Sequence, residues 1–386
     1  MGNDQRNLKP EFARLLINQG NQSFNLDNVE DCLVRFNEAQ EIINSVDGNC
    51  CELEQAGLSY NFGLVHYKLG SYDISKKYFN DAFKFAMKIS NKSSGQIHGS
   101  IDTATILNYL ANIKLIEKKY DAAIKCYERS AYLRREVIVE GTTRISDKFT
   151  SNYVSLTGTL SNLALAHHKR KSYVKAINVV KAGLALIPDE RSTSFNRVLA
   201  KLHYQLGNIF LSQNMLQSAN ICFQKSLYIF IQLLESTPPT QFLQIEGEFG
   251  SIKLQLETGL ERTRHGIGLV LAREGRLEEA IDLFQDVLRK KRSLQLRAVN
   301  KSGDPDIGKL LCDMARGELK SYNLRDARCN LDDAMKEFAM CQNISFGNDY
   351  LKEARRIERR IKSTEDESFH FLDNTSEVSD ITPATQ

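Results

Sequence analysis

The sequence contains no tryptophan, and only 6 prolines and 22 glycines occur among its 386 residues. So few turn-forming residues argue against sandwiches and barrels, which need many short turns, and favour long helices. The chain is 42% hydrophobic and 26% charged, which excludes wholesale disorder because a core of ordinary size can be buried. The length fits two or three domains, or one elongated array of repeats.

Export and membrane segments are missing as well. Residues 1–7 are polar and mixed in charge, without the apolar stretch of a secretory signal. The longest apolar stretch, at 227–234, is far shorter than the ~20 residues that span a bilayer. The 8 cysteines are scattered and show no Cys-x-x-Cys spacing, which favours reduced thiols. We therefore expect a cytoplasmic protein, with the nucleus as the other compartment, and no contact with membranes.

No catalytic motif is present in the sequence. His-Glu-x-x-His, Gly-x-Ser-x-Gly and a phosphate-binding loop are all missing. Gly266 and Gly268 resemble the start of a dinucleotide fingerprint, but Leu271 stands where the third glycine belongs. The adjacent His167 and His168 cannot face one metal ion on a helix, where neighbours point ~100° apart. We expect no enzymatic activity, no cofactor and no metal.

Charge is distributed unevenly along the chain. Residues 364–386 contain no lysine or arginine and six acids, whereas residues 1–363 carry 51 basic and 48 − 6 = 42 acidic residues. A body with a net charge of +9 therefore precedes an acidic segment of low hydrophobicity, for which we predict disorder.

Self-comparison shows a repeated pattern of small and bulky residues. The first small residue is Gly20, Gly63, Ala111, Ala164, Gly207, Gly268 or Ala315. The second follows twelve positions later and is Cys32, Ser75, Ala123, Ala176, Ala219, Ala280 or Ala327. Four positions further comes a bulky residue, namely Phe36, Phe79, Tyr127, Val180, Phe223, Phe284 or Leu331. After three more positions stands Ala39, Ala82, Ser130, Gly183, Ser226, Val287 or Ala334. Small residues let two antiparallel helices approach to ~8–10 Å, and we expect the bulky one to fill the space beside the crossing.

This pattern resembles the tetratricopeptide repeat, a helix-turn-helix unit of ~34 residues. The resemblance implies an all-α, right-handed superhelical solenoid of seven repeats. The first small residues are spaced 43, 48, 53, 43, 61 and 47 positions apart, so the helices or loops must be longer than in the family. The asparagine-bearing segments 107–112 and 160–164 are similar to the first helices of kinesin light chains.

The pattern also suggests an organisation of the chain. We predict a leader at 1–10, seven repeats at 11–345, a capping helix at 346–363 and an acidic disordered tail at 364–386. Polar segments at 90–99, 141–150, 236–241 and 298–305 are predicted to be loops.

The resemblance further implies that the first helix of each repeat lines a concave groove. The positions that would face this groove are basic or rich in asparagine, with Asp313 as their one acid. We call the following nineteen residues the inner-face set: Asn18, Asn21, Tyr60, Asn61, Lys68, Asn108, Asn112, Asn162, His168, Lys169, Lys201, Tyr204, Asn208, Arg262, His265, Arg273, Lys309, Arg316 and Lys320. Tyr109 lies at the same register. Asparagine is a poor helix former, so its recurrence calls for an explanation.

Two interpretations of the inner-face set remain open. The asparagines could grip the backbone of a bound peptide while the cations attract its acidic groups, or they could link neighbouring repeats. The first predicts a non-enzymatic scaffold or adaptor that binds an extended or helical, acidic segment of a protein. The alternatives are an RNA-binding helical repeat protein and a kinesin-light-chain-like adaptor of a motor. RNA is less favoured, because the cations alternate with glutamates along the chain.

Overall fold

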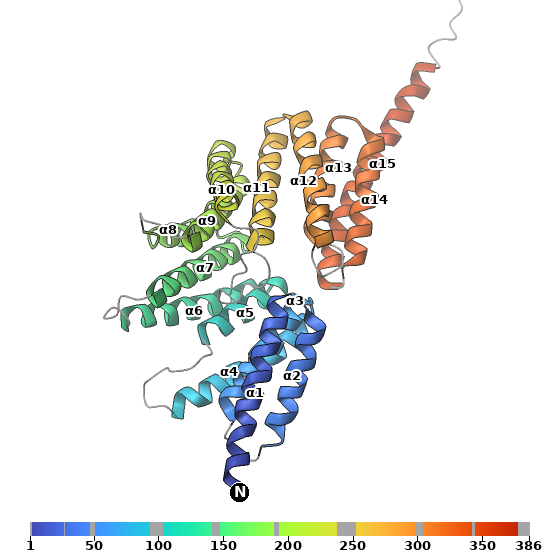
Figure 1. Ribbon diagram of the computed structural model, residues 1–386. Helices are drawn as coiled ribbons and strands as arrows, with labels where there is room; N and C mark the ends of the chain where they lie inside the picture. The colour runs from blue at the N-terminus through green and yellow to red at the C-terminus, as the bar shows by residue number, and fades with distance from the viewer. Residues whose placement is uncertain are drawn as a thin grey trace, which may run out of the picture. The chain divides into compact units, whose positions relative to one another are not determined.

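The computed structural model describes residues 2–26, 28–46, 51–92, 103–140, 147–188, 193–237, 252–297, 304–341 and 344–376. The predicted loops and the last ten residues of the predicted tail lie mostly or entirely outside these ranges. The regular elements of the described ranges are α-helices, as predicted (Figure 1). They are α1 (Gly2–Asn25), α2 (Val29–Asn44), α3 (Glu52–Lys68), α4 (Tyr72–Lys92), α5 (Thr103–Ile116), α6 (Tyr120–Glu140), α7 (Asp147–Lys169), α8 (Tyr173–Leu184), α9 (Thr193–Ser212), α10 (Leu216–Ser236), α11 (Ile252–Glu274), α12 (Leu277–Arg297), α13 (Pro305–Lys320), α14 (Leu324–Met340) and α15 (Ile344–Ser376).

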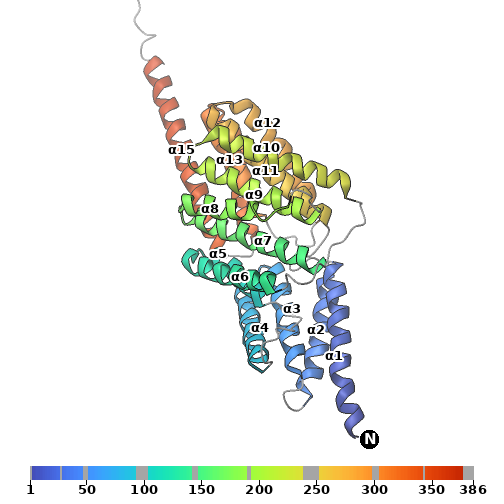
Figure 2. The same cartoon turned by 90° about the vertical axis from the view of Figure 1, so that its left-hand side faces the viewer.

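The helices form sequential antiparallel hairpins, which confirms the predicted architecture. α1 packs on α2, α3 on α4, α5 on α6, α7 on α8, α9 on α10 and α13 on α14 (Figures 1 and 2). α11 meets α12 where Phe284 lies on Gly268. α15 then packs on α13 and α14 in the position of a further first helix. The chain divides into two compact units, residues 1–263 and 264–386, and the boundary falls inside α11.

Tight turns of one type connect the two helices of each hairpin from the second to the seventh. In each turn, the residue seven positions after the first small residue has a positive φ: Gly70, Lys118, Lys171, Asn214, Gly275 or Tyr322, with φ between 60° and 86°. A left-handed conformation costs ~1–2 kcal/mol for a residue with a Cβ. In four of the six turns a residue other than glycine adopts this conformation despite the cost. This indicates that the packing of the hairpin determines the geometry of the turn.

The paired small residues are buried, as predicted, but the bulky residue does not lie beside the crossing. Its ring lies directly on the first small residue. A Cβ added to Gly63 would stand 2.7 Å from the Phe79 ring, and one added to Gly207 would stand 2.6 Å from Phe223. Such distances are shorter than any real carbon contact, so only glycine fits beneath the ring.

Where alanine replaces the glycine, the partner is smaller in two of three hairpins. Ala164 pairs with Val180 and Ala315 with Leu331, and all four side chains are buried. The volume at the contact is therefore roughly conserved in these two hairpins, which is the combination that packed cores tolerate best. The third hairpin instead combines Ala111 with Tyr127, and both are buried.

The hydroxyl groups at small positions have a separate role. Ser75 Oγ donates to the carbonyl of Gly63 at 2.7 Å, joining α4 to α3. Ser130 Oγ donates to Ala104 O at 2.7 Å, and Ser226 Oγ to Ala200 O at 2.9 Å. Serine at these positions is thus small enough to fit and supplies a buried hydrogen bond between the two helices.

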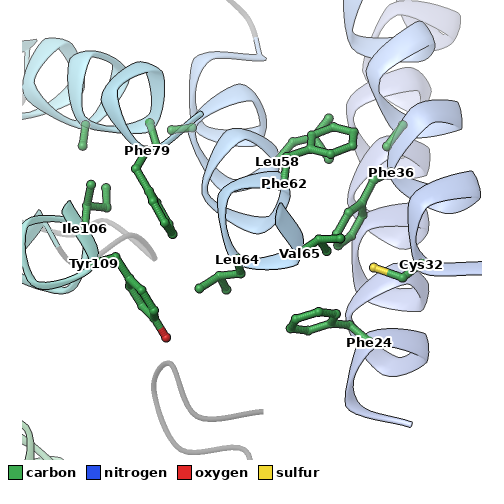
Figure 3. Close-up of a cluster of buried hydrophobic side chains, with 14 of the residues drawn as sticks. Phe24, Cys32, Phe36, Leu58, Phe62, Leu64, Val65, Phe79, Ile106 and Tyr109 are labelled. Carbon is green, nitrogen blue, oxygen red and sulfur yellow. The ribbon is translucent and has the colours of Figure 1, made fainter. Parts of the chain in front are cut away.

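A continuous aromatic and aliphatic core runs through the first hairpins (Figure 3). The Phe36 ring meets Phe62 edge-on at 5.5 Å between centroids, which joins the first hairpin to the second. The Phe79 ring stacks on Tyr109 at 5.0 Å, which joins the second to the third. Each ring therefore bridges neighbouring repeats as well as the two helices of its own hairpin.

Both ends of the chain are more helical than expected. α1 begins at Gly2, within the predicted leader, and continues through Pro10. α15 passes residue 363 and ends at Ser376, inside the predicted tail. Lys362 pairs with Glu358 at 3.5 Å, and Arg328 of α14 pairs with Glu365. Glu365 lies beyond Ile361, the last residue of the apolar pattern, so its contact with α14 falls where the sequence pattern had ended.

We expect Gly63→Ala to destabilise the protein by ~1–3 kcal/mol, because the added methyl group would overlap the Phe79 ring. Gly158 in α7 is the matched control, since a Cβ there would meet nothing within 4 Å. Gly158→Ala should stabilise the protein by ~0.5–1 kcal/mol through helix propensity. Urea unfolding followed by circular dichroism measures both changes, and a shift of the same sign in both variants would refute the packing argument.

Candidate peptide-binding face

The inner-face set lies on the first helices of the hairpins. Residues 18–262 of the set belong to the first unit, on α1, α3, α5, α7, α9 and the beginning of α11. Residues 265–320 belong to the second unit, on the end of α11 and on α13. We therefore describe two inner faces, one on each unit.

Several asparagines of the set bond within the fold. Asn162 Nδ2 of α7 donates to Asn108 Oδ1 of α5 at 3.5 Å, which links two neighbouring first helices. Asn112 Oδ1 accepts from the Tyr127 hydroxyl at 2.5 Å. Asn208 Nδ2 donates to the Tyr204 carbonyl one turn earlier, at 3.0 Å. At these positions the interpretation of asparagine as a structural link is favoured.

Tyrosines of the first unit form an aromatic cluster on the same helices. Tyr60 lies 5.9 Å from the Phe79 ring and 6.3 Å from Tyr109. Tyr67 lies 5.3 Å from Tyr109, and burial raises the pKa of its hydroxyl. These contacts tie α3 to α5, so Tyr60 contributes to the core as well as to the surface.

Cations of the second unit are paired with acids. His265 Nε2 lies 3.0 Å from Asp313 Oδ2, and Arg316 binds both Asp313 and Glu353. Lys309 lies 3.4 Å from Asp306 and 4.6 Å from the centre of the Tyr350 ring. Asp306 and Glu353 therefore join Asp313 as acids at this face. The net charge of the inner face of the second unit is closer to neutral than the sequence indicated.

A polar contact joins His168 of α7 to Ser212 of α9, and we call these two residues the notch. His168 Nε2 lies 2.8 Å from Ser212 Oγ. The Ser212 hydroxyl donates its hydrogen to the Asn208 carbonyl at 2.9 Å, so its oxygen must accept from His168. Nε2 therefore carries the proton, and Nδ1 has a free lone pair.

One buried acceptor atom at the notch lacks a donor, and so does another nearer the start of α9. His168 Nδ1 and Gln205 Oε1 are buried, and neither has a hydrogen-bond partner among the described residues. Burial lowers the pKa of His168 to about 4, so its ring is neutral at pH 7. An unsatisfied buried acceptor costs ~1–3 kcal/mol, which a bound donor would recover.

Gln205 is a residue that the sequence pattern did not single out. It stands two positions before Gly207, the same register as Asn18, Asn61 and Asn162 in their repeats. The register therefore places Gln205 among the positions that would face the groove. Gln205 was not selected because the pattern was read from asparagines and cations.

Metal sites and membrane spans are missing from the described residues. Those residues contain no cluster of three or more histidines, cysteines or acids that could hold a metal ion. None of their helices is long and apolar enough to cross a membrane. Burial raises the pKa of the Cys32 and Cys312 thiols to about 12, which makes both poor nucleophiles.

The tetratricopeptide repeat family matches residues 56–86 and 104–137, which correspond to the hairpins α3–α4 and α5–α6. These two hairpins are similar to tetratricopeptide repeats. The repeat protein matches no curated protein sequence.

Solved structures share the fold of the repeat protein at low sequence identity. The apo form of RapI is 14% identical, covers 91% of this chain and 99% of its own, and has a TM-score of 0.56. NprR in complex with its cognate peptide NprX is 13% identical, covers 99% and 90%, and also has a TM-score of 0.56. A Rap protein complexed with Competence and Sporulation Factor is 10% identical, covers 92% and 99%, and has a TM-score of 0.50.

We expect His168 to remain neutral, with the proton on Nε2, down to about pH 4. An unfolded histidine takes up its proton near pH 6.5, so His168 favours the folded state above that pH, and this contribution is lost between pH 6.5 and 4. ¹⁵N NMR of the imidazole nitrogens reports both the tautomer and the titration. An Nδ1–H signal at pH 7, or a midpoint near 6.5, would contradict the hydrogen-bond assignment.

Proposed function

We propose that the repeat protein is a non-enzymatic scaffold or adaptor that binds a peptide segment of a protein partner on the inner face of its first unit. The observation that carries this proposal is that two neighbouring first helices carry buried acceptors without a partner among the described residues, His168 Nδ1 on α7 and Gln205 Oε1 on α9. Two proteins of the same fold have been solved in complexes, NprR with its cognate peptide NprX and a Rap protein with Competence and Sporulation Factor. These complexes support the proposal.

The acceptors define what the partner must offer. An N–H group satisfies a lone pair, whereas a carboxylate oxygen brings a second lone pair and is repelled. An extended peptide presents backbone N–H groups all along its length, and most of them are unbonded before binding. The notch is therefore suited to the main chain of the peptide.

Acidic side chains of the partner have a different place on this face. Lys169 and Arg262 are exposed members of the inner-face set, and both lie in the first unit. Carboxylates beside the gripped backbone would be attracted to these cations. The proposed partner is thus an acidic peptide, with the main chain as the part that the notch recognises.

Selection of a random phage-displayed peptide library on the immobilised full chain supplies a peptide probe for this face. Calorimetry then compares binding of the selected peptide to the wild type, His168→Ala and Gln205→Ala. Each substitution should weaken binding about tenfold, because a hydrogen bond to a buried acceptor is worth ~1–3 kcal/mol. His168→Asn keeps an acceptor close to the position of Nδ1 and should restore most of the affinity.

Gln224→Ala is the matched control, since Gln224 is exposed on α10, a second helix. Its affinity should equal that of the wild type. Methylation of single peptide amides should reproduce the loss at one or two positions only. The proposal fails if no peptide is enriched, or if the selected peptides bind His168→Ala and Gln205→Ala as tightly as the wild type.

A further inference from the structure

α15 carries an unusual concentration of positive charge. Residues 352–362 contain six cations and two acids, a net charge of 6 − 2 = +4, whereas the entire chain has a net charge of only +3. The six cations are all exposed. We call them the α15 stripe: Lys352, Arg355, Arg356, Arg359, Arg360 and Lys362.

Helical geometry places the stripe on one face. Ala354, Ile357 and Ile361 are buried in the core that α15 shares with α13 and α14. At ~100° per residue, the six cations fall within an arc of about 160° centred opposite these three. At ~1.5 Å per residue, the stripe is about 16 Å long. It therefore lies along the outer face of about three turns of α15.

The two acids lie at the edges of the stripe and do not interrupt it. Glu353 binds Arg316 of α13 and lies 3.4 Å from Arg356, and Glu358 lies 3.5 Å from Lys362. Within the described part of the chain, Arg355, Arg359 and Arg360 pair with no carboxylate. Three of the six cations of the stripe, in its middle part, thus keep a charge that no described carboxylate neutralises.

Capping the repeat array does not require this arrangement. A terminal helix needs a polar outer face to keep the end of the core soluble, and a mixture of charges provides that at no electrostatic cost. Six like charges over three turns repel one another instead, since pairs at i, i+4 destabilise a helix by ~0.2–0.5 kcal/mol. A counter-charge on a partner would offset that repulsion.

The chemistry of the stripe favours phosphate over carboxylate. The outer face of residues 352–362 exposes no large apolar side chain, so nothing there would hold the apolar residues of a peptide. Binding must then be electrostatic, which a nucleic acid supports with about one phosphate per 1.7 Å of duplex. Four of the six cations are arginines, whose planar fork binds phosphate oxygens in pairs.

We propose that the α15 stripe binds the phosphate backbone of a nucleic acid. The contact is independent of base sequence, because hydrogen bonds to phosphate oxygens carry no direct information on the bases. The site is separate from the inner face of the first unit, so this proposal does not depend on the proposed peptide binding.

Fluorescence anisotropy with the full chain tests the proposal. The probes are fluorescein-labelled 20-nucleotide RNA, the corresponding RNA duplex and a DNA duplex of equal length, between 50 and 200 mM salt. We expect binding of at least one duplex, with an affinity that falls steeply with salt. Arg355→Glu/Arg359→Glu should weaken it at least tenfold and reduce the salt slope by about two. The neutral pair Arg355→Gln/Arg359→Gln should give an intermediate loss.

The matched control is Lys77→Glu/Lys84→Glu on α4, which changes the net charge equally at two exposed lysines of the first unit. It should bind as the wild type does. The proposal is overturned if no probe binds at 50 mM salt, or if control and stripe variants lose equal affinity. It is also overturned if polyglutamate, or vesicles containing phosphatidylserine, displace the duplex at lower charge concentration than unlabelled duplex does.

Discussion

The contact between an aromatic ring and the backbone of a glycine holds four of the hairpins together. In those hairpins, Phe36, Phe79, Phe223 or Phe284 lies on the glycine of the first helix so closely that no Cβ would fit. The contact sets the distance between the two helices, and in three of the four hairpins the residue seven positions after the glycine has a left-handed conformation. The Phe36 and Phe79 rings also meet the next hairpin, so the spacing of α1, α3 and α5 depends on them.

Fixed spacing of the first helices decides what their polar residues can do. Where two of these side chains meet, they bond to each other, as Asn162 does with Asn108. His168 instead donates from Nε2 to the Ser212 hydroxyl, and Ser212 donates to the Asn208 carbonyl. His168 Nδ1 is then left as a buried acceptor without a donor among the described residues. The inner face therefore combines structural links with buried acceptors, such as His168 Nδ1, that can still accept a hydrogen bond.

The hairpins could be predicted from the sequence because fourteen small residues recur in one register. The fate of each inner-face residue could not, since the register places Asn108, Asn162 and Gln205 on one face but says nothing about which of them touch. Lys309 and Arg316 looked like free cations, yet Asp306 and Glu353 neutralise them from one turn earlier and from another helix. The extent of α15 was missed because residues 364–376 lack the apolar period that marks the first part of the helix.

A double-mutant cycle at Gly207 and Phe223 tests the ring-on-glycine packing most directly. Gly207→Ala overfills the contact and Phe223→Val empties it, while the double variant recreates the Ala164 and Val180 pair of the fourth hairpin. The account predicts that the double variant is more stable than the sum of the two single losses by at least ~1 kcal/mol. Losses that add to within ~0.5 kcal/mol would show that the two residues do not share one packing volume.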